Sequence, residues 1–191
     1  MDKKAAFVQK YYDIAQQAGA KYKINPTVIL AQAAHESGWG TSHLAVSCHN
    51  FFGITAYGSN NEYWSGEKIA NPKIPTLVFR IYKTDLDGFM DFAKLISGKY
   101  KAAAAVSSDS TQYAKAIAYS PYIAEKNGDN RPLYEKAIIS NSSFIQTQLQ
   151  FVKKKVVEHK KGIAGGLVAL SLSALLFYKR KQIITYLTKK P

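Results

Sequence analysis

Residues 25–42 read NPTVILAQAAHESGWGTS and carry the clearest structural signals in the chain. Asn25 can accept a hydrogen bond as a helix N-cap, and Pro26 suits the first helical position because its missing N–H would have no partner there. The apolar run that follows reaches Gly38, a residue that favours a helix end. These features predict a helix that begins at Pro26 and ends near Gly38, with Glu36 close to its C-terminus.

Helical patterns also precede and follow this segment, each recognised by apolar residues at spacings of three and four. Glycines that follow two of these patterns are expected to stop the helices, and Thr84 is expected to cap one of them. The predicted helices cover residues 3–18 with Gly19 as the stop, 84–98 with Gly98 as the stop, 111–118 and 132–139, and a helical pattern resumes from about residue 143.

Residues 47–82 differ in composition, being rich in aromatic residues, Gly, Asn and Pro. Two short stretches in this region, residues 51–54 and 76–82, are candidate strands. The region therefore predicts a small β lobe inserted among helices. The expected fold class is α+β, mainly α, with one domain over residues 1–150.

The formal net charge of +13 is concentrated in the tail. Residues 1–152 carry 16 Lys or Arg against 12 Asp or Glu, whereas residues 153–191 carry 10 against 1. The tail contains 17 residues without a charge, GIAGGLVALSLSALLFY at 162–178. We expect residues 151–191 to form a basic linker, a transmembrane helix over 162–178 and a basic end, with an apolar helix docked on the domain as the alternative. Nucleic acid is not an expected partner, because the basic residues flank an apolar run.

The chain has a single cysteine, and its histidines are not spaced as metal ligands, which argues against a disulfide and against a metal site. Cys48 has no partner within the chain. His35, His43 and His49 lack the spacing of a metal-ligand set. We expect no metal and no other cofactor.

Glu36 shares one helical face with Ile29 and Ala33, at spacings of three and four. That face is otherwise apolar, which predicts a carboxyl directed inward and partly desolvated. Burial and the partial negative charge of a helix C-terminus would both raise the pKa of that carboxyl. The pattern therefore indicates a general acid that holds its proton near neutral pH, with a solvated surface Glu as the alternative.

The run from Gln32 to Ser42 resembles the signature of the bacterial glucosaminidase family of autolysins and flagellar peptidoglycan hydrolases. In that family the Glu before Ser-Gly-Trp-Gly is the proton donor, which corresponds to Glu36 here, while His35 stands where an apolar residue is more usual. Further motifs follow in the family's order, so that the resemblance covers about residues 5–140. They are Asn50-Phe51-Phe52-Gly53-Ile54, Trp64-Ser65-Gly66, Phe79-Arg80-Ile81-Tyr82, and Ser120-Pro121-Tyr122-Ile123 with Tyr134.

The resemblance implies a lysozyme-like α+β domain that cuts N-acetylglucosaminyl bonds in peptidoglycan as an endo-β-N-acetylglucosaminidase. It also implies a second carboxylate in the β lobe, but residues 68–76 contain no acidic residue. Glu67 and Glu62 are the nearest candidates, and Glu67 is the residue we expect. Substrate assistance by the N-acetyl group and a water held by Tyr122 are alternatives.

Aromatic rings suit sugar faces, so several are expected in the groove. Trp39 also fits a packing role after its helix, and Trp64 fits groove and core equally well. The residues expected to bind substrate are Trp39, Asn50, Phe52, Tyr57, Trp64 and Tyr119.

Two other functions are compatible with the sequence. A lytic transglycosylase also uses one Glu in a lysozyme-like groove, and a glycan-binding membrane protein with an impaired site would explain the missing acid. The expected location is the bacterial cell envelope, with the chain associated with a membrane. The first residues are nevertheless typical of an amphipathic helix rather than a secretion signal.

Overall fold

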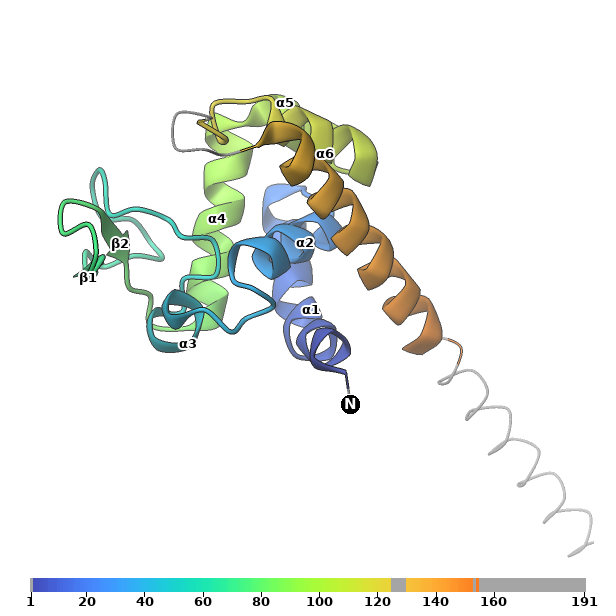
Figure 1. Ribbon diagram of the computed structural model, residues 1–191, viewed down its shortest axis with the longest axis horizontal. Helices are drawn as coiled ribbons and strands as arrows, with labels where there is room; N and C mark the ends of the chain where they lie inside the picture. Colours follow the sequence, from blue (N-terminus) through green and yellow to red (C-terminus); the bar gives the residue numbers. More distant parts are fainter. Residues whose placement is uncertain (1, 125–129, 153, 155–191) are drawn as a thin grey trace, which may run out of the picture. The chain divides into compact units, whose positions relative to one another are not determined.

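The computed structural model of the protein describes residues 2–124, 130–152 and 154 (Figure 1). The chain divides into two compact units, Met1–Gln148 and Leu149–Pro191. The apolar helix expected over residues 162–178 lies outside the described residues. Within the described part of the chain, no helix is both long and apolar enough to cross a bilayer.

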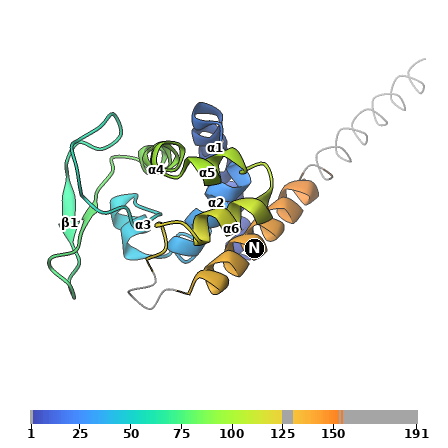
Figure 2. The same cartoon turned by 90° about the horizontal axis from the view of Figure 1, so that it is seen from above.

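The helix α2, Pro26–Glu36, runs through the middle of the first unit, as Figures 1 and 2 show. Its predicted start is confirmed, because the Asn25 side chain accepts a hydrogen bond from the Thr27 N–H at 2.9 Å. All residues from Thr27 to Ala34 are buried. The helix contacts α1 (Lys3–Tyr22) on one side and α6 (Ser110–Ala118) on another, so it is covered all round and not only along one stripe.

The turn after α2 explains the sequence Ser-Gly-Trp-Gly that follows Glu36. Gly38, Trp39 and Gly40 all have positive φ angles, of 59°, 61° and 75°. The buried Ser37 hydroxyl accepts a hydrogen bond from the Gly40 N–H at 2.7 Å and donates one to the Ala33 carbonyl. Two of the three left-handed positions carry glycine, the residue that adopts this conformation at least cost.

The remaining helices complete a mainly helical unit, which confirms that part of the predicted fold class. Two of them, α3 and α5, were not predicted, and the patterns at residues 132–139 and from 143 belong to one continuous helix. Their bounds are α3 (His43–Cys48), α4 (Asp85–Lys99), α5 (Lys101–Ala105), and helical backbone over residues 131–152.

Two glycines expected to stop helices lie inside them, so these predicted ends were wrong. Gly19 is buried within α1, where its missing side chain leaves room for the Ile24 carbonyl, and the helix ends with Lys23 in the left-handed conformation. Gly98 has open space around it, and α4 continues until Tyr100 acts as its C-cap. Gly19 is thus explained by the turn that follows the helix end, because the chain folds back there and brings the Ile24 carbonyl against it.

The β lobe contains one antiparallel pair, β1 (Lys68–Ala70) and β2 (Val78–Arg80). β2 confirms the strand expected within residues 76–82, in a shorter form. The strand expected at residues 51–54 is wrong, because Phe51 and Phe52 form a turn whose side chains are buried. Their rings pack on α4, and the rings of Phe52 and Phe92 are stacked with centroids 3.7 Å apart.

Candidate active site

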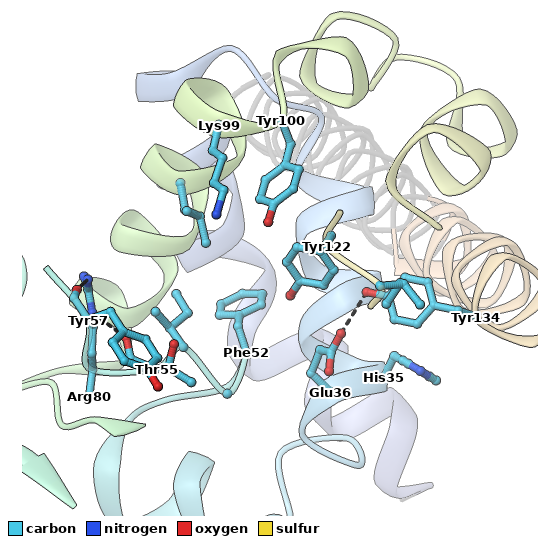
Figure 3. A pocket seen from close by; sticks show the side chains of 14 residues that line it. His35, Glu36, Phe52, Thr55, Tyr57, Arg80, Lys99, Tyr100, Tyr122 and Tyr134 are labelled. Atoms are coloured by element: carbon cyan, nitrogen blue, oxygen red, sulfur yellow. Dashed lines mark hydrogen bonds between the residues drawn. The ribbon is translucent and has the colours of Figure 1, made fainter. Parts of the chain in front are cut away.

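Glu36 is the last residue of α2 and lies where the helix meets the turn described above. Its Oε1 atom accepts a hydrogen bond from the Tyr134 hydroxyl at 2.8 Å (Figure 3). The residue is exposed, in contrast to the inward, partly desolvated carboxyl expected from the helical face. The reason is its position at the end of α2, where the helix leaves the core and opens onto a pocket.

A pocket of about 560 Å³ has Glu36 on its wall. Its lining comes from α2, the loop at residues 52–57, β2, the end of α4, residues 122–123 and the helix that begins at residue 131. The described residues that line it are His35, Glu36, Phe52, Gly53, Ile54, Thr55, Tyr57, Arg80, Leu95, Lys99, Tyr100, Tyr122, Ile123 and Tyr134. Its volume lies within the range of about 300–1,000 Å³ typical of small-molecule sites.

Two tyrosines face the carboxylate side of this pocket. Figure 3 shows the Tyr122 hydroxyl pointing into the pocket, between Phe52 and Glu36. Burial raises the pKa of both Tyr122 and Tyr134 well above the usual value for a phenol, and the negative charge of Glu36 raises it further. Both hydroxyls therefore keep their protons across the physiological range and can act as hydrogen-bond donors.

His35 lines the pocket next to Glu36, and its ring meets the Tyr134 ring edge to face at a centroid distance of 4.9 Å. Partial removal of water from this imidazole lowers its pKa. The ring is therefore mainly neutral near pH 7 and adds little positive charge beside Glu36.

Arg80 holds the far wall of the pocket in place. Its Nη1 atom pairs with Asp91 Oδ2 of α4 at 2.7 Å, and its Nη2 and Nε atoms donate to the carbonyls of Tyr57 and Thr55 at 2.8 and 3.2 Å. The guanidinium also lies over the Trp64 ring, 4.3 Å from its centroid. These contacts tie the loop that carries Tyr57 to α4, so Arg80 shapes the pocket.

Four residues predicted to serve the site are brought together in the pocket: Glu36, Phe52, Tyr57 and Tyr122. Phe52 is nearly buried, with 4% of its surface exposed, and forms part of the floor. Tyr57 is 70% exposed at the pocket edge, on a loop whose backbone Arg80 holds. An exposed ring on a fixed backbone is suited to contact a sugar face.

The two tryptophans predicted to bind substrate lie elsewhere. Trp39 packs edge to face against Phe7 and Phe144, at centroid distances of 5.6 and 5.4 Å, and does not line the pocket. Trp64 is 3% exposed, and its Nε1 donates to the Glu67 carbonyl at 2.6 Å. Both rings therefore have packing roles. Removal of a large apolar side chain from water stabilises the folded protein.

Asn50, Tyr119 and Glu67 are likewise outside the pocket lining. Asn50 is buried and uses its whole side-chain amide on the backbone of Ile54 and Arg80, at distances of 2.9–3.0 Å. Tyr119 is 51% exposed just after α6, and Glu67 is exposed on the β lobe. The structure thus gives Asn50 a part in building the loop beside the pocket.

Glu62, the other acid considered for the β lobe, is held in a surface cluster. Its Oε1 atom accepts a hydrogen bond from Tyr22 at 3.2 Å and lies 3.8 and 3.5 Å from the amines of Lys21 and Lys94. Hydrogen bonds from Tyr63 and Tyr22 lower the pKa of Glu62. This carboxylate joins the β lobe to α1 and α4 and does not line the pocket.

Sequence reasoning missed several residues that the fold brings to Glu36. Tyr100 and Lys99 line the pocket from the end of α4. Gln32 is fully buried one helical turn before Glu36, and its side-chain amide reaches Tyr134 at 2.8 Å. A polar residue four positions before an acid, within an otherwise apolar helix, was a signal available in the sequence. Among the described residues, no group of three His, Cys, Asp or Glu side chains is placed to hold a metal ion.

Comparisons with known proteins identify the family to which the chain is related. The profile of the glucosaminidase family, described as mannosyl-glycoprotein endo-beta-N-acetylglucosaminidase, matches residues 12–153. Peptidoglycan hydrolase FlgJ of Vibrio parahaemolyticus is 27% identical over 154 residues, which cover 73% of this chain and 49% of that protein. Exo-glucosaminidase LytG of Bacillus subtilis is 31% identical over 98 residues, which cover 50% of this chain and 35% of that protein.

The fold itself matches a solved glycoside hydrolase domain. The domain from Salmonella typhimurium FlgJ has a TM-score of 0.65 and 25% identity, over 85% of this chain and 99% of that chain. The chain therefore spans nearly all of that glycoside hydrolase domain but 49% and 35% of the two curated relatives. Since the family profile covers most of its length, the chain belongs to the glucosaminidase family.

Proposed function

We propose that this chain is a glycoside hydrolase that cleaves N-acetylglucosaminyl bonds within peptidoglycan strands, with Glu36 as the general acid. The observation that carries this proposal is a carboxyl group on the wall of a pocket, held by a tyrosine hydroxyl at 2.8 Å. A relative named as a peptidoglycan hydrolase and membership of the glucosaminidase family support the substrate class.

In this mechanism Glu36 donates its proton to the oxygen of the leaving sugar. The hydrogen bond from Tyr134 restricts rotation of the carboxyl group, so that the proton is offered in one direction. The neighbouring Tyr122 hydroxyl keeps its proton and can donate to a sugar oxygen or hold a water. Rings at the pocket edge and wall, including Tyr57 and Tyr100, offer flat faces to pyranose rings.

The second step of the reaction needs a nucleophile or a base, which most glycosidases provide with a second carboxylate. Of the described residues that line the pocket, Glu36 is the one carboxylate. Glu62 is engaged in its surface cluster and Glu67 is exposed on the β lobe. We therefore favour attack by the substrate's own N-acetyl oxygen over the Glu67 mechanism, with a water held by Tyr122 as the alternative.

Replacement of Glu36 by Gln tests the acid directly. The amide keeps the shape and can still accept the Tyr134 hydrogen bond, but it cannot donate a catalytic proton. We expect release of soluble fragments from purified cell walls to fall by about 10²–10⁴-fold, with an unchanged melting temperature. More than a tenth of the normal activity in a folded variant would exclude Glu36 as the acid.

A lytic transglycosylase is the second candidate, because a site whose described lining holds one carboxylate also suits internal cyclisation. Mass spectrometry of the products separates the two reactions: hydrolysis leaves reducing ends, whereas a transglycosylase leaves anhydro-sugars. Fragment length separates internal cleavage from release of terminal sugars, the activity indicated by the name of the Bacillus relative. An intact wall after prolonged incubation would instead support a glycan-binding protein.

Attachment to a membrane is a separate part of the proposal and rests on sequence alone. Residues 162–178 carry no charge and are bounded by lysines, which suits a short bilayer helix with snorkelling flanks. In this arrangement the tail would hold the catalytic domain near the cell wall.

A further inference from the structure

Three side chains from three helical segments form a chain of hydrogen bonds that ends on Glu36. Tyr113 of α6 donates its hydroxyl proton to Gln32 Oε1. Gln32 Nε2 donates to the Tyr134 hydroxyl oxygen at 2.8 Å, and Tyr134 donates to Glu36 Oε1 at 2.8 Å. Gln32 and Glu36 are four residues apart on α2, so both project from the same face of that helix.

The chain has a direction because each phenol has a single proton to give. Tyr134 can donate to Glu36 because Gln32 presents its N–H₂ group, and not its oxygen, toward Tyr134. If the Gln32 amide were reversed, its oxygen would attract the Tyr134 proton and Glu36 would lose this donor. Donation from Tyr113 to Oε1 disfavours that reversal, so the orientation of one amide decides where the Tyr134 proton points.

Burial limits these side chains to the hydrogen-bond partners described above. Tyr113 and Gln32 are both 0% exposed, and Tyr134 is 7% exposed, so water cannot readily replace a lost partner. Burial also raises the pKa of Tyr113 and Tyr134 far above neutral, so both remain donors at any working pH. Gln32 does not titrate. The donor that reaches Glu36 is therefore the same throughout the pH range of activity.

We propose that Gln32 and Tyr113 are positioning residues for catalysis: they hold Tyr134 as a donor to Glu36 without touching the substrate. Neither residue lines the pocket. The proposal rests on the proposed role of Glu36 as the acid. Its consequence is that the orientation of the carboxyl and its affinity for a proton depend on a hydroxyl group two hydrogen bonds beyond Tyr134.

The test compares Tyr113→Phe and Gln32→Met with the matched control Tyr22→Phe, all in the full chain. Tyr22 is a half-buried tyrosine whose hydroxyl donates to Glu62 Oε1 at 3.2 Å, in the surface cluster outside the pocket lining. All three variants lose a side-chain hydrogen bond and should lose some stability. Only the first two should change catalysis.

For Tyr113→Phe and Gln32→Met we expect kcat on peptidoglycan to fall on the order of ten-fold, with KM within about two-fold. The basic limb of the pH–rate profile should move upward by about one pH unit, because a hydrogen bond donated to a carboxylate favours its charged form. Tyr22→Phe should keep the normal profile. An unshifted profile in Tyr113→Phe, in a variant that is folded but less stable, would overturn the proposal.

A double-mutant cycle with Tyr134→Phe then tests the route of the effect. If Tyr113 acts through Tyr134, removal of its hydroxyl should cost nothing further in the Tyr134→Phe background, and additive losses would contradict the proposal. The Glu36→Gln measurement distinguishes failure of the proposed function from failure of the positioning role. An active Glu36→Gln variant would contradict the proposed function itself. An inactive Glu36→Gln variant, together with additive losses in the tyrosine variants, would contradict only the positioning role.

Discussion

Tyr57 and Tyr119 show how two exposed tyrosines of one chain acquire different roles. Tyr57 is 70% exposed at the pocket edge, while Tyr119 is 51% exposed outside the pocket lining. The Tyr57 carbonyl is bound by Arg80, which is itself paired with Asp91. A ring on such a fixed backbone loses little conformational freedom when a sugar stacks on it. The entropic cost of binding is therefore smaller, and more of the contact energy appears as affinity.

We therefore expect Tyr57→Ala to raise KM for glycan strands by roughly three- to ten-fold, the range that corresponds to loss of one aromatic contact. The value of kcat should change little, because the ring lies at the pocket edge. Steady-state kinetics on soluble glycan fragments would measure both constants. Tyr119→Ala serves as the matched control and should leave KM unchanged; equal effects in the two variants would refute a binding role specific to Tyr57.

At the scale of the element, the end of α2 links helix termination to catalysis. The helix stops at Glu36, and the following residues reverse the chain through three positive φ angles at Gly38, Trp39 and Gly40. Ser37 secures the reversal with one donated and one accepted hydrogen bond. The same turn that ends the helix thus carries Glu36 out of the core and onto the pocket wall.

Ser37→Ala should consequently lower the free energy of unfolding by about 1–3 kcal/mol, because the half-buried Gly40 N–H loses its acceptor. Activity should fall as well, since the turn positions Glu36. Chemical denaturation compared with the Ser97→Ala variant provides the control. The Ser97 hydroxyl donates to the Lys94 carbonyl on an exposed part of α4, and its loss should cost less than about 0.5 kcal/mol. Equal stability of the two variants would show that Ser37 does not secure the turn.

At the scale of the whole molecule, the chain separates into Met1–Gln148 and Leu149–Pro191. Every residue of the proposed site belongs to the first unit, and the family profile ends at residue 153. The charge is divided in the same way, with 10 of the 26 Lys and Arg residues after position 152. The catalytic and attachment parts of the proposal therefore depend on different parts of the chain.

A chain that ends at residue 155 should fold and keep its activity on isolated walls. The full chain should sediment with membranes and stay there in high salt, because burial of apolar residues is insensitive to ionic strength. Fractionation of both forms, followed by a salt wash and a detergent wash, measures this. Release of the full chain by salt alone would instead indicate a peripheral contact between the basic tail and lipid headgroups.

The sequence by itself determined the features that depend on neighbouring residues. Asn25 and Pro26 start α2, and Thr84 caps α4, because capping involves residues two or three positions apart. Gly38 also placed Glu36 near the end of α2, whereas the helical spacing was wrong in directing its carboxyl inward. The mainly helical class with a small β lobe followed from the same local patterns, and the ordered motifs identified the family.

Only the tertiary structure decided which side chains reach Glu36 and which serve packing. Tyr134 donates to Glu36 across 98 positions, and Tyr113 contacts Gln32 across 81. Trp39, close to Glu36 in sequence, instead packs against Phe7 and Phe144. Helix and turn signals in a sequence reflect interactions between residues that are close along the chain. The contacts of Glu36 and Trp39 form only when distant segments pack together and exclude water. An aromatic residue suits a core or a pocket equally well, so its role is decided by that packing.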